Sequence, residues 1–391
     1  MQNRFLALAG VLLRRARRRP VRGAGRVLVP SVVELVDHER NVHDIRDLEI
    51  TDLLGRHQID TDLDSIAGYL GGKRVLVTGA GGSIGAELCR QICRFAPAEL
   101  IMLDRDETAL QAVQLSMDPQ AQLTDPTVIL ASLRDTGRVR EIFRGWRPQV
   151  VFHAAALKHL PLLERYPGEA VKTNVWGTLA VLEAADGVER FVNISTDKAA
   201  DPVSVLGYTK RITERTTAYV AGSSPGTFLS VRFGNVLGSR GSVFSTFSAQ
   251  IAAGGPITVT HPDVVRYFMT IQEAVHLVIQ AAAIGRDGEA LVLEMGEPVR
   301  IADVARQMAR LAPEPVEMKF TGLRTGEKLG EVLFGAGEVD RRPFHPLIAH
   351  VEVPPLDPAA ARELDAGAEP AALIAALAEL CERAPSARRA A

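Results

Sequence analysis

One short stretch limits the folds open to this chain: residues 73–92, where a glycine-rich turn separates an apolar run from a helical pattern. The run from Arg74 to Thr78 predicts a buried strand, and the residues after Ile84 predict a helix with one apolar face. The turn between them carries three spaced glycines, Gly79, Gly82 and Gly85. Glycine lets the backbone approach a phosphate, and the free N–H groups of a helix's first turn attract an anion. The stretch therefore predicts a cradle for a pyrophosphate. The alternative is a glycine turn in a sheet protein that binds no nucleotide.

Strands and helices alternate after this turn. The predicted strands cover residues 74–78, 100–104, 127–131, 149–153, 190–195 and 227–233, and the predicted helices cover 84–95, 108–115, 136–146, 169–185 and 206–220. Such alternation favours a parallel sheet covered on both faces, with ligands at the carboxyl ends of the strands. The predicted fold class is α/β, a Rossmann-type doubly wound parallel sheet with a smaller C-terminal substrate-binding lobe.

Changes in composition divide the chain into four predicted segments. Residues 1–43 form a basic arm, and residues 44–235 form a dinucleotide-binding domain that begins with short helices. Gly, Pro and Ser become frequent over 236–350, which predicts a substrate-binding lobe. Residues 351–391 form a helical tail, with one helix over 371–382.

The bulk composition excludes several classes of protein. The chain has 391 residues and a net charge of −2, so its overall charge gives no support for nucleic-acid binding. Its three cysteines do not make a disulfide framework. Cys89 and Cys93 lie one helical turn apart, which favours packing over a metal pair because no second Cys/His pair is near. These features are typical of a cytoplasmic protein.

The N-terminus is the exception to this balanced charge. Arginines crowd around an apolar run over residues 5–13 that is too short to cross a bilayer. The basic block follows the apolar run, which is the reverse of a secretory signal. Two interpretations remain, a solvated arm or a helix lying on an anionic membrane surface. The second would make the protein peripheral at the inner face of the membrane.

A cluster of reactive side chains follows the fifth predicted strand. Thr196, Asp197 and Lys198 come directly after the apolar residues, and Lys210 lies on the next helix. A nucleotide cradle combined with a hydroxyl, an acid and two lysines indicates hydride chemistry, in which nicotinamide accepts the hydride and side chains move protons. The alternative for Asp197 and Lys198 is a surface ion pair.

These motifs resemble a known family. The chain is similar to the extended short-chain dehydrogenases/reductases, and among them to the CapD-like UDP-N-acetylglucosamine 4,6-dehydratases of polysaccharide biosynthesis. The matching stretches run in family order over most of the chain: Thr78–Gly85, His153–His159, Glu169–Val175, Ser195–Ala199, Val231–Gly241, Arg266–Thr270 and Thr321–Lys328.

Two departures refine this resemblance. Short-chain dehydrogenases usually carry Tyr-x-x-x-Lys, but counting back from Lys210 gives Leu206, which cannot donate a proton. Tyr208 is a poor substitute, because side chains two positions apart on a helix point about 200° apart. The long-form branch of the family also lacks this tyrosine: it carries Met at the same position and relies on Thr-Asp-Lys. Leu206 therefore makes the chain similar to that branch. Long-form members also carry transmembrane helices and a further domain, and we expect this chain to be a soluble version.

The resemblance implies a reaction and a role for each motif. It implies a 4,6-dehydratase with internally recycled NAD that oxidises the sugar at C4, eliminates water across C5 and C6, and returns the hydride to C6. Lys198 would remove the C5 proton, Asp197 would protonate the departing hydroxyl, Thr196 would hold the C4 hydroxyl, and Lys210 would bond the nicotinamide ribose.

The predicted binding residues extend along the chain. The acid at Asp104, with Arg105 beside it, favours NAD over NADP, because a carboxylate repels a 2′-phosphate. The predicted cofactor residues are Gly79, Gly82, Ser83, Ile84, Gly85, Asp104, Arg105, Asp135, Ala154, Ala155, Lys158, Asn174 and Lys210. The predicted residues for the UDP-sugar are Lys158, His159, Asn235, Arg240, Arg266 and Glu327. No metal is predicted, and a homo-oligomer is expected.

Two other functions fit the same fold. One is an NAD-dependent epimerase or 5,6-dehydratase acting on a nucleotide sugar. Leu206 argues against the epimerase, because it cannot exchange a proton. The other is a binding or scaffold protein without activity, which the complete Thr196–Lys198 motif disfavours.

Overall fold

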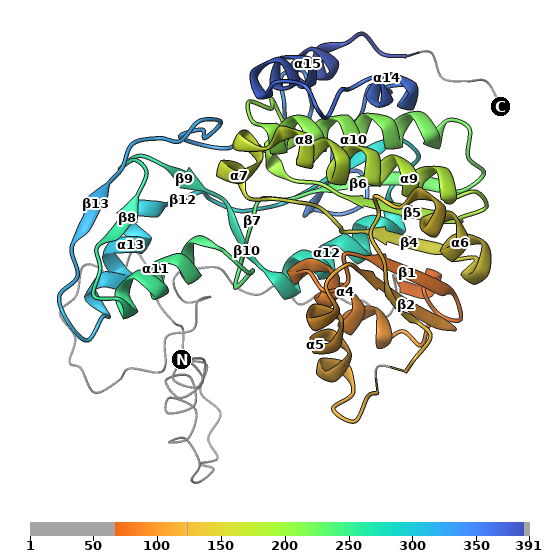
Figure 1. Cartoon of the computed structure of the whole chain (residues 1–391), viewed down its shortest axis with the longest axis horizontal. Coiled ribbons are helices and arrows are strands. Elements are labelled where there is room, and N and C mark those ends of the chain that lie inside the picture. The colour runs from red at the N-terminus through yellow and green to blue at the C-terminus, as the bar shows by residue number, and fades with distance from the viewer. Residues whose placement is uncertain (1–66, 123, 387–391) are drawn as a thin grey trace. The chain divides into compact units, whose positions relative to one another are not determined.

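The computed structural model describes residues 67–122 and 124–386 (Figure 1). The basic arm over 1–43 and most of the short helices expected before residue 70 lie outside the described residues. Within the described part of the chain, no helix is both long enough and apolar enough to cross a membrane.

An eight-stranded sheet forms the centre of the molecule. Its strand order is β14-β11-β6-β5-β4-β1-β2-β3, and every neighbouring pair is parallel except β11 and β14. The strands are β1 (Arg74–Thr78), β2 (Glu99–Asp104), β3 (Val128–Leu130), β4 (Val150–His153), β5 (Arg190–Ile194), β6 (Thr227–Arg232), β11 (Glu289–Leu293) and β14 (Ile348–Glu352). The predicted α/β, Rossmann-type class is confirmed.

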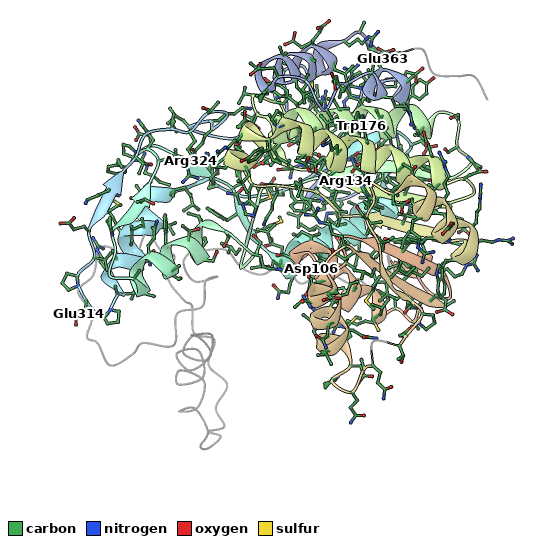
Figure 2. The ribbon with its side chains drawn as sticks, viewed as in Figure 1. Asp106, Arg134, Trp176, Glu314, Arg324 and Glu363 are labelled. Carbon is green, nitrogen blue, oxygen red and sulfur yellow. The ribbon has the colours of Figure 1, made fainter. Side chains whose placement is uncertain are left out.

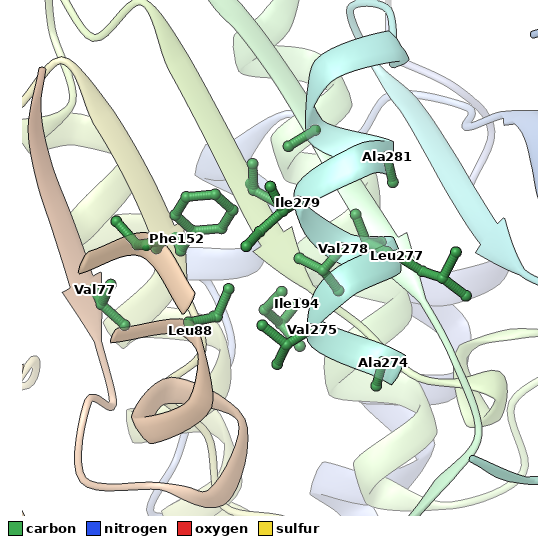
Figure 3. Packing of buried hydrophobic residues seen from close by; sticks show 14 of the residues in the cluster. Val77, Leu88, Phe152, Ile194, Ala274, Val275, Leu277, Val278, Ile279 and Ala281 are labelled. Carbon is green, nitrogen blue, oxygen red and sulfur yellow. The ribbon is translucent and has the colours of Figure 1, made fainter. Parts of the chain in front are cut away.

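Helices cover both faces of this sheet, as the alternation predicts (Figure 1). The main ones are α4 (Ser83–Cys93), α5 (Glu107–Met117), α6 (Thr136–Trp146), α9 (Trp176–Ala184), α10 (Val205–Ala221) and α12 (Ile271–Ile284). Strand β1 serves both faces: Val75 and Val77 pack into one apolar cluster and Leu76 into the other. Figure 3 shows the first cluster, in which Leu88 of α4 is seen between Val77 of β1 and Val275 of α12. This two-sided burial fixes β1, and with it the glycine turn that follows.

The structure changes one predicted helix in a way that matters for the site. The predicted helix over 169–185 is divided into α8 (Pro167–Ala170), a π turn over Val171–Val175 and α9. A π turn adds a residue to the helical repeat and redirects side chains. Here the buried Asn174 amide donates to Leu157 O and to Thr209 Oγ1, and Asn174 Oδ1 accepts from Leu157 N. Periodicity alone does not reveal this interruption.

Residues 236–350 do not form one continuous lobe, which differs from the predicted boundaries. The chain leaves the sheet after β6, returns with α12 and β11, leaves again and returns with β14. The reason is that α12 and β11 are apolar enough to join the central core. The smaller lobe comprises β7 (Asn235–Leu237), α11 (Val243–Ala252), β8 (Ile257–Val259), β9 (Val265–Arg266), β10 (Phe268–Thr270), β12 (Val299–Arg300), α13 (Ile301–Arg310) and β13 (Met318–Phe320).

The C-terminal part packs against α10. It contains α14 (Pro358–Arg362) and α15 (Pro370–Glu382), and the buried Arg215 of α10 donates to the carbonyl groups of Leu380 and Cys381. The tail predicted from residue 351 therefore starts inside β14 and is joined to the main domain. Cys89 is buried and Cys93 is exposed, and no metal-binding group of His, Cys, Asp or Glu occurs among the described residues.

Candidate active site

The glycine turn after β1 is shaped by close backbone contacts. Gly79 has φ +67°, and a Cβ there would lie 2.6 Å from Ala155 Cα. A Cβ on Gly85 would overlap the carbonyl oxygen of Gly79. Gly82 is the N-cap of α4 and no side chain caps this helix, so its first N–H groups face the turn without a side-chain acceptor. This arrangement fits the phosphates of a dinucleotide.

Two adjoining cavities extend from this turn. The first, of about 250 Å³, is lined by Asp104, Arg105 and Arg134, together with Ala131 and Ser132 at the end of β3. The second, of about 600 Å³, is lined by Ser83, Ile84, Lys158, His159, Thr196, Lys198, Leu206, Lys210 and Asn235. Gly82, Ala154 and Arg240 line both. Two compartments that meet at a phosphate cradle match the two halves of a dinucleotide, so the residues fit NAD.

The first cavity holds a fixed carboxylate. Asp104 Oδ2 accepts from Gly81 N at 2.8 Å, and Oδ1 accepts from the backbone N–H groups of Arg105 and Asp106. Arg134, labelled in Figure 2, lines the same cavity and donates to Thr173 Oγ1. This is the compartment in which a ribose hydroxyl would meet an acceptor.

Asp135 does not line either cavity. Its carboxylate caps α6 by accepting from Arg138 N at 2.9 Å. Its contact with adenine stays a prediction.

The predicted proton-transfer residues lie together at the carboxyl end of β5. Lys198 Nζ donates to Asp197 Oδ1 at 3.0 Å and to Asn235 Oδ1 at 3.4 Å, and Thr196 Oγ1 donates to Asp197 Oδ1 at 2.9 Å. Asp197 is fully buried, in a short 3₁₀ helix over Asp197–Ala199. Gly234 makes this burial feasible, because a Cβ there would lie 2.9 Å from Asp197 Oδ2. The surface ion pair considered from the sequence is therefore excluded.

Lys210 and Leu206 line the same cavity from α10. Lys210 Nζ donates to Ile194 O at 2.7 Å. Burial lowers the pKa of Lys210 to about 8, against the opposing effect of Glu214. Leu206 presents an apolar surface at the position where the motif of the wider group carries tyrosine. Tyr208 does not line the cavity; it packs against the apolar cluster to which Leu206 also belongs.

A cationic rim covers the glycine turn. Arg240 N donates to Ser83 Oγ at 3.1 Å, and its guanidinium donates to Gly81 O. Burial and Arg240 lower the pKa of Lys158, and burial and Lys158 lower that of His159. The loop after β7 brings Arg240 over the start of α4, where it lines both cavities, and its contact with the UDP moiety stays a prediction.

Arg266 and Glu327 lie together but away from the two cavities. Arg266 Nη2 is 3.2 Å from Glu327 Oε1, which also accepts from Thr260 Oγ1. Neither residue lines a described cavity, and their contact with substrate stays a prediction.

Sequence reasoning missed one acid of this site. Glu331 is buried, and its Oε1 lies 3.6 Å from Lys198 Nζ. The available signal was a single glutamate within the otherwise apolar run Leu329–Phe334. Nothing in that pattern indicates which part of the chain the glutamate contacts.

The chain matches known proteins over most of its length. The model of the family described as "Polysaccharide biosynthesis protein" matches residues 75–353. The chain is 45% identical over 328 residues to the probable polysaccharide biosynthesis protein EpsC of Bacillus subtilis, covering 82% of this chain and 55% of that protein. It is 43% identical over 318 residues to the capsular polysaccharide biosynthesis protein CapD of Staphylococcus aureus, covering 80% and 53%. The chain therefore spans about half the length of these curated relatives.

A solved structure shares the fold. The structure of Pen from Bacillus thuringiensis superposes with a TM-score of 0.66 at 30% identity, covering 74% of this chain and 90% of that one. The resemblance to CapD-like proteins that the motifs indicated is confirmed.

Proposed function

Because the chain belongs to the polysaccharide biosynthesis protein family, we propose that it is an NAD-dependent nucleotide-sugar 4,6-dehydratase. The substrate we propose is UDP-N-acetylglucosamine, and the product is a UDP-4-keto-6-deoxy-N-acetylhexosamine. The observation that carries the proposal is the position of Thr196, Asp197 and Lys198. Their side chains lie within one hydrogen-bonded chain at a cavity that adjoins the phosphate cradle.

When bound in this cavity, NAD would supply reversible hydride transfer, from C4 of the sugar and back to C6. The glycine turn and the first turn of α4 would hold the pyrophosphate, and Asp104 would accept from the adenosine ribose. Lys210, fixed on Ile194 O, would bond the nicotinamide ribose.

The proton steps belong to the chain's own side chains. Thr196 orients the C4 hydroxyl. Oxidation at C4 acidifies the C5 proton, which the neutral Lys198 amine removes while the protonated Asp197 gives its proton to the departing C6 hydroxyl. The short distance between Asp197 Oδ1 and Lys198 Nζ supports a coordinated exchange of protons between these groups.

Leu206 favours dehydration over the reactions of tyrosine-dependent relatives. It lines the cavity and carries no proton, so acid–base work falls to the residues after β5. Incubation with a panel of UDP- and dTDP-sugars, read by mass spectrometry and proton NMR, tests the proposal. Dehydration removes one water from the substrate, whereas epimerisation leaves the mass unchanged and would contradict the proposal.

A further inference from the structure

The segment between β13 and β14 is fastened to the loop that carries Asp197 and Lys198. Lys328 Nζ donates to the carbonyl groups of Ala200 and Asp201, and Ala336 N donates to Asp201 Oδ1 at 2.8 Å. Between these two attachments, Glu331 reaches the site. Its side chain is 3% exposed, and its Oε1 lies 3.6 Å from Lys198 Nζ.

The burial of the Glu331 carboxylate is unfavourable for the stability of the fold. Its Oε2 is buried and has no hydrogen-bond partner among the described residues, and the same is true of Asp197 Oδ2. Burying an unpaired carboxylate oxygen is unfavourable, and such groups concentrate where chemistry needs them. Two buried carboxylates therefore flank one lysine, and both have an unused acceptor.

We propose that Glu331 is a positioning residue for proton transfer: its carboxylate holds the Lys198 amine beside Asp197 and keeps a proton within that pair. The inference rests on the proposed function. Lys198 Nζ donates to Asp197 Oδ1 and to Asn235 Oδ1, and Glu331 Oε1 lies at an ion-pair distance of 3.6 Å from the same amine.

The charges balance through the elimination step. In the proposed mechanism Asp197 and Lys198 start neutral and Glu331 starts with one negative charge. The C5–H bond breaks and its proton goes to Lys198 Nζ, the electron pair forms the C5–C6 double bond, and the C6 hydroxyl leaves as water with the proton of Asp197. Afterwards Lys198 is positive and both carboxylates are negative, so the cluster keeps a charge of −1. Glu331 favours this exchange because it stabilises the new ammonium.

Three other titratable residues lie around Asp197, Lys198 and Glu331. Tyr267, between β9 and β10, interacts with Asp197, and its own pKa is raised first by burial and then by Glu297 and Asp197. Lys158 and Lys210 line the same cavity. Glu331 is thus the one acid besides Asp197 with an ion-pair distance to Lys198 among the described residues.

The test replaces Glu331 by Gln, which keeps the shape and removes the charge. We expect kcat of Glu331→Gln to fall about 10- to 100-fold with KM changed less than about twofold. Without the negative neighbour the cluster gives up its protons more readily, so both limbs of the pH–rate profile move to lower pH by about one unit. Glu331→Asp should restore part of the rate and of the profile. A profile that stays in place, with or without a loss of rate, overturns the inference.

Glu338 provides a matched control, because its buried carboxylate pairs with Arg232 and does not contact Lys198. Glu338→Gln should lower the melting temperature and leave the pH–rate profile in place. If the profile of Glu338→Gln moves as far as that of Glu331→Gln, the effect is general and the inference is wrong.

A measurement without turnover separates this inference from the proposed function. In protein labelled with ¹⁵N at lysine Nζ, the Lys198 signal, identified with Lys198→Arg, should titrate at lower pH in Glu331→Gln than in the wild type. An unchanged titration overturns the inference even if the enzyme dehydrates its substrate. A wild-type protein that converts no nucleotide sugar overturns the proposed function, and the titration still decides the role of Glu331.

Discussion

Two buried clusters of charged residues differ in how completely their polar atoms are paired. In the first, Arg232 donates to both oxygens of Glu214, at 3.0 and 2.7 Å, and to Glu338 at 2.6 Å. Ser195 Oγ also donates to Glu214 at 2.6 Å. In the second, Asp197 and Glu331 share Lys198, and each keeps one buried oxygen without a partner among the described residues.

We infer from this difference that the first cluster holds the fold, and we propose that the second does the chemistry. Burial lowers the pKa of Arg232, but the ion pairs with Glu214 and Glu338 outweigh this effect and raise it. This cluster therefore keeps a fixed charge, and Ser195 links it to the start of the reactive loop. The Lys198 cluster has unused acceptors, as a group that exchanges protons needs. Substitutions in the two clusters should therefore affect stability and activity differently.

The largest expected effect is on activity in the second cluster. Lys198→Ala should reduce exchange of the C5 proton with solvent by about 10³-fold, because the general base is removed. The melting temperature of the variant is measured as a control for folding, because the change also removes the cation beside the buried Asp197 and Glu331 carboxylates. Deuterium incorporation at C5 in D₂O, followed by NMR, gives the rate. Exchange at the wild-type rate would remove Lys198 from its assigned role.

The next effect is on stability in the first cluster. Arg232→Met leaves Glu214 and Glu338 buried without their cation, which should cost about 3–5 kcal/mol. Urea unfolding measures this cost. Arg138→Met breaks an exposed pair with Glu141 and should change stability by less than about 1 kcal/mol. Equal effects of the two substitutions would contradict the structural role of the Arg232 cluster.

A buried histidine extends the comparison to pH. His153 lies between Thr78 Oγ1 and Thr178 Oγ1, each at 2.8 Å, and burial, then Lys210, lowers its pKa from 6.5 to about 3. Below pH 6.5 the unfolded chain binds a proton that the folded protein does not. His153 therefore costs about 1.4 kcal/mol of stability per pH unit as the pH falls from 6.5 towards 3.

His153→Gln should flatten this dependence, measured by urea unfolding at several pH values. The exposed His261→Gln serves as the control and should keep the wild-type slope. Identical slopes for wild type and His153→Gln would show that His153 is not neutral in the fold.

The smallest effect is expected at Asp104, an intermediate case. Both oxygens of its carboxylate accept hydrogen bonds, as in the Arg232 cluster. Asp104 also lines a cavity, as Lys198 does. Asp104→Asn should weaken NAD binding by about 1 kcal/mol, roughly fivefold, and bring the affinity for NADP closer to that for NAD. Equilibrium dialysis with both dinucleotides measures this. An unchanged preference would assign the discrimination to other residues.

The sequence predicted the parts of the site that are local. The glycine turn, the strand before it and the helix after it form one continuous stretch, so their pattern was sufficient to place the phosphate cradle. Lys198 and Asp197 were found because they follow directly on a buried strand. These features depend on neighbours in sequence.

The features that were missed depend on distant contacts. Glu331 meets Lys198 from 133 positions away, and no periodicity records such a pairing. The π turn at Val171–Val175 is held by the bonds of Asn174 to Leu157 and Thr209, which a helical pattern does not reveal. The return of β11 and β14 to the central sheet depends on the pairing of β11 with the distant strands β6 and β14.

The most direct test of the central claim follows one deuterium atom. UDP-N-acetylglucosamine carrying deuterium at C4 is incubated with the wild-type protein, and the product is examined by mass spectrometry and NMR. The proposed mechanism predicts a product that has lost one water, with the deuterium now in the C6 methyl group. Deuterium that remains at C4, or a product that keeps the mass of the substrate, would contradict it.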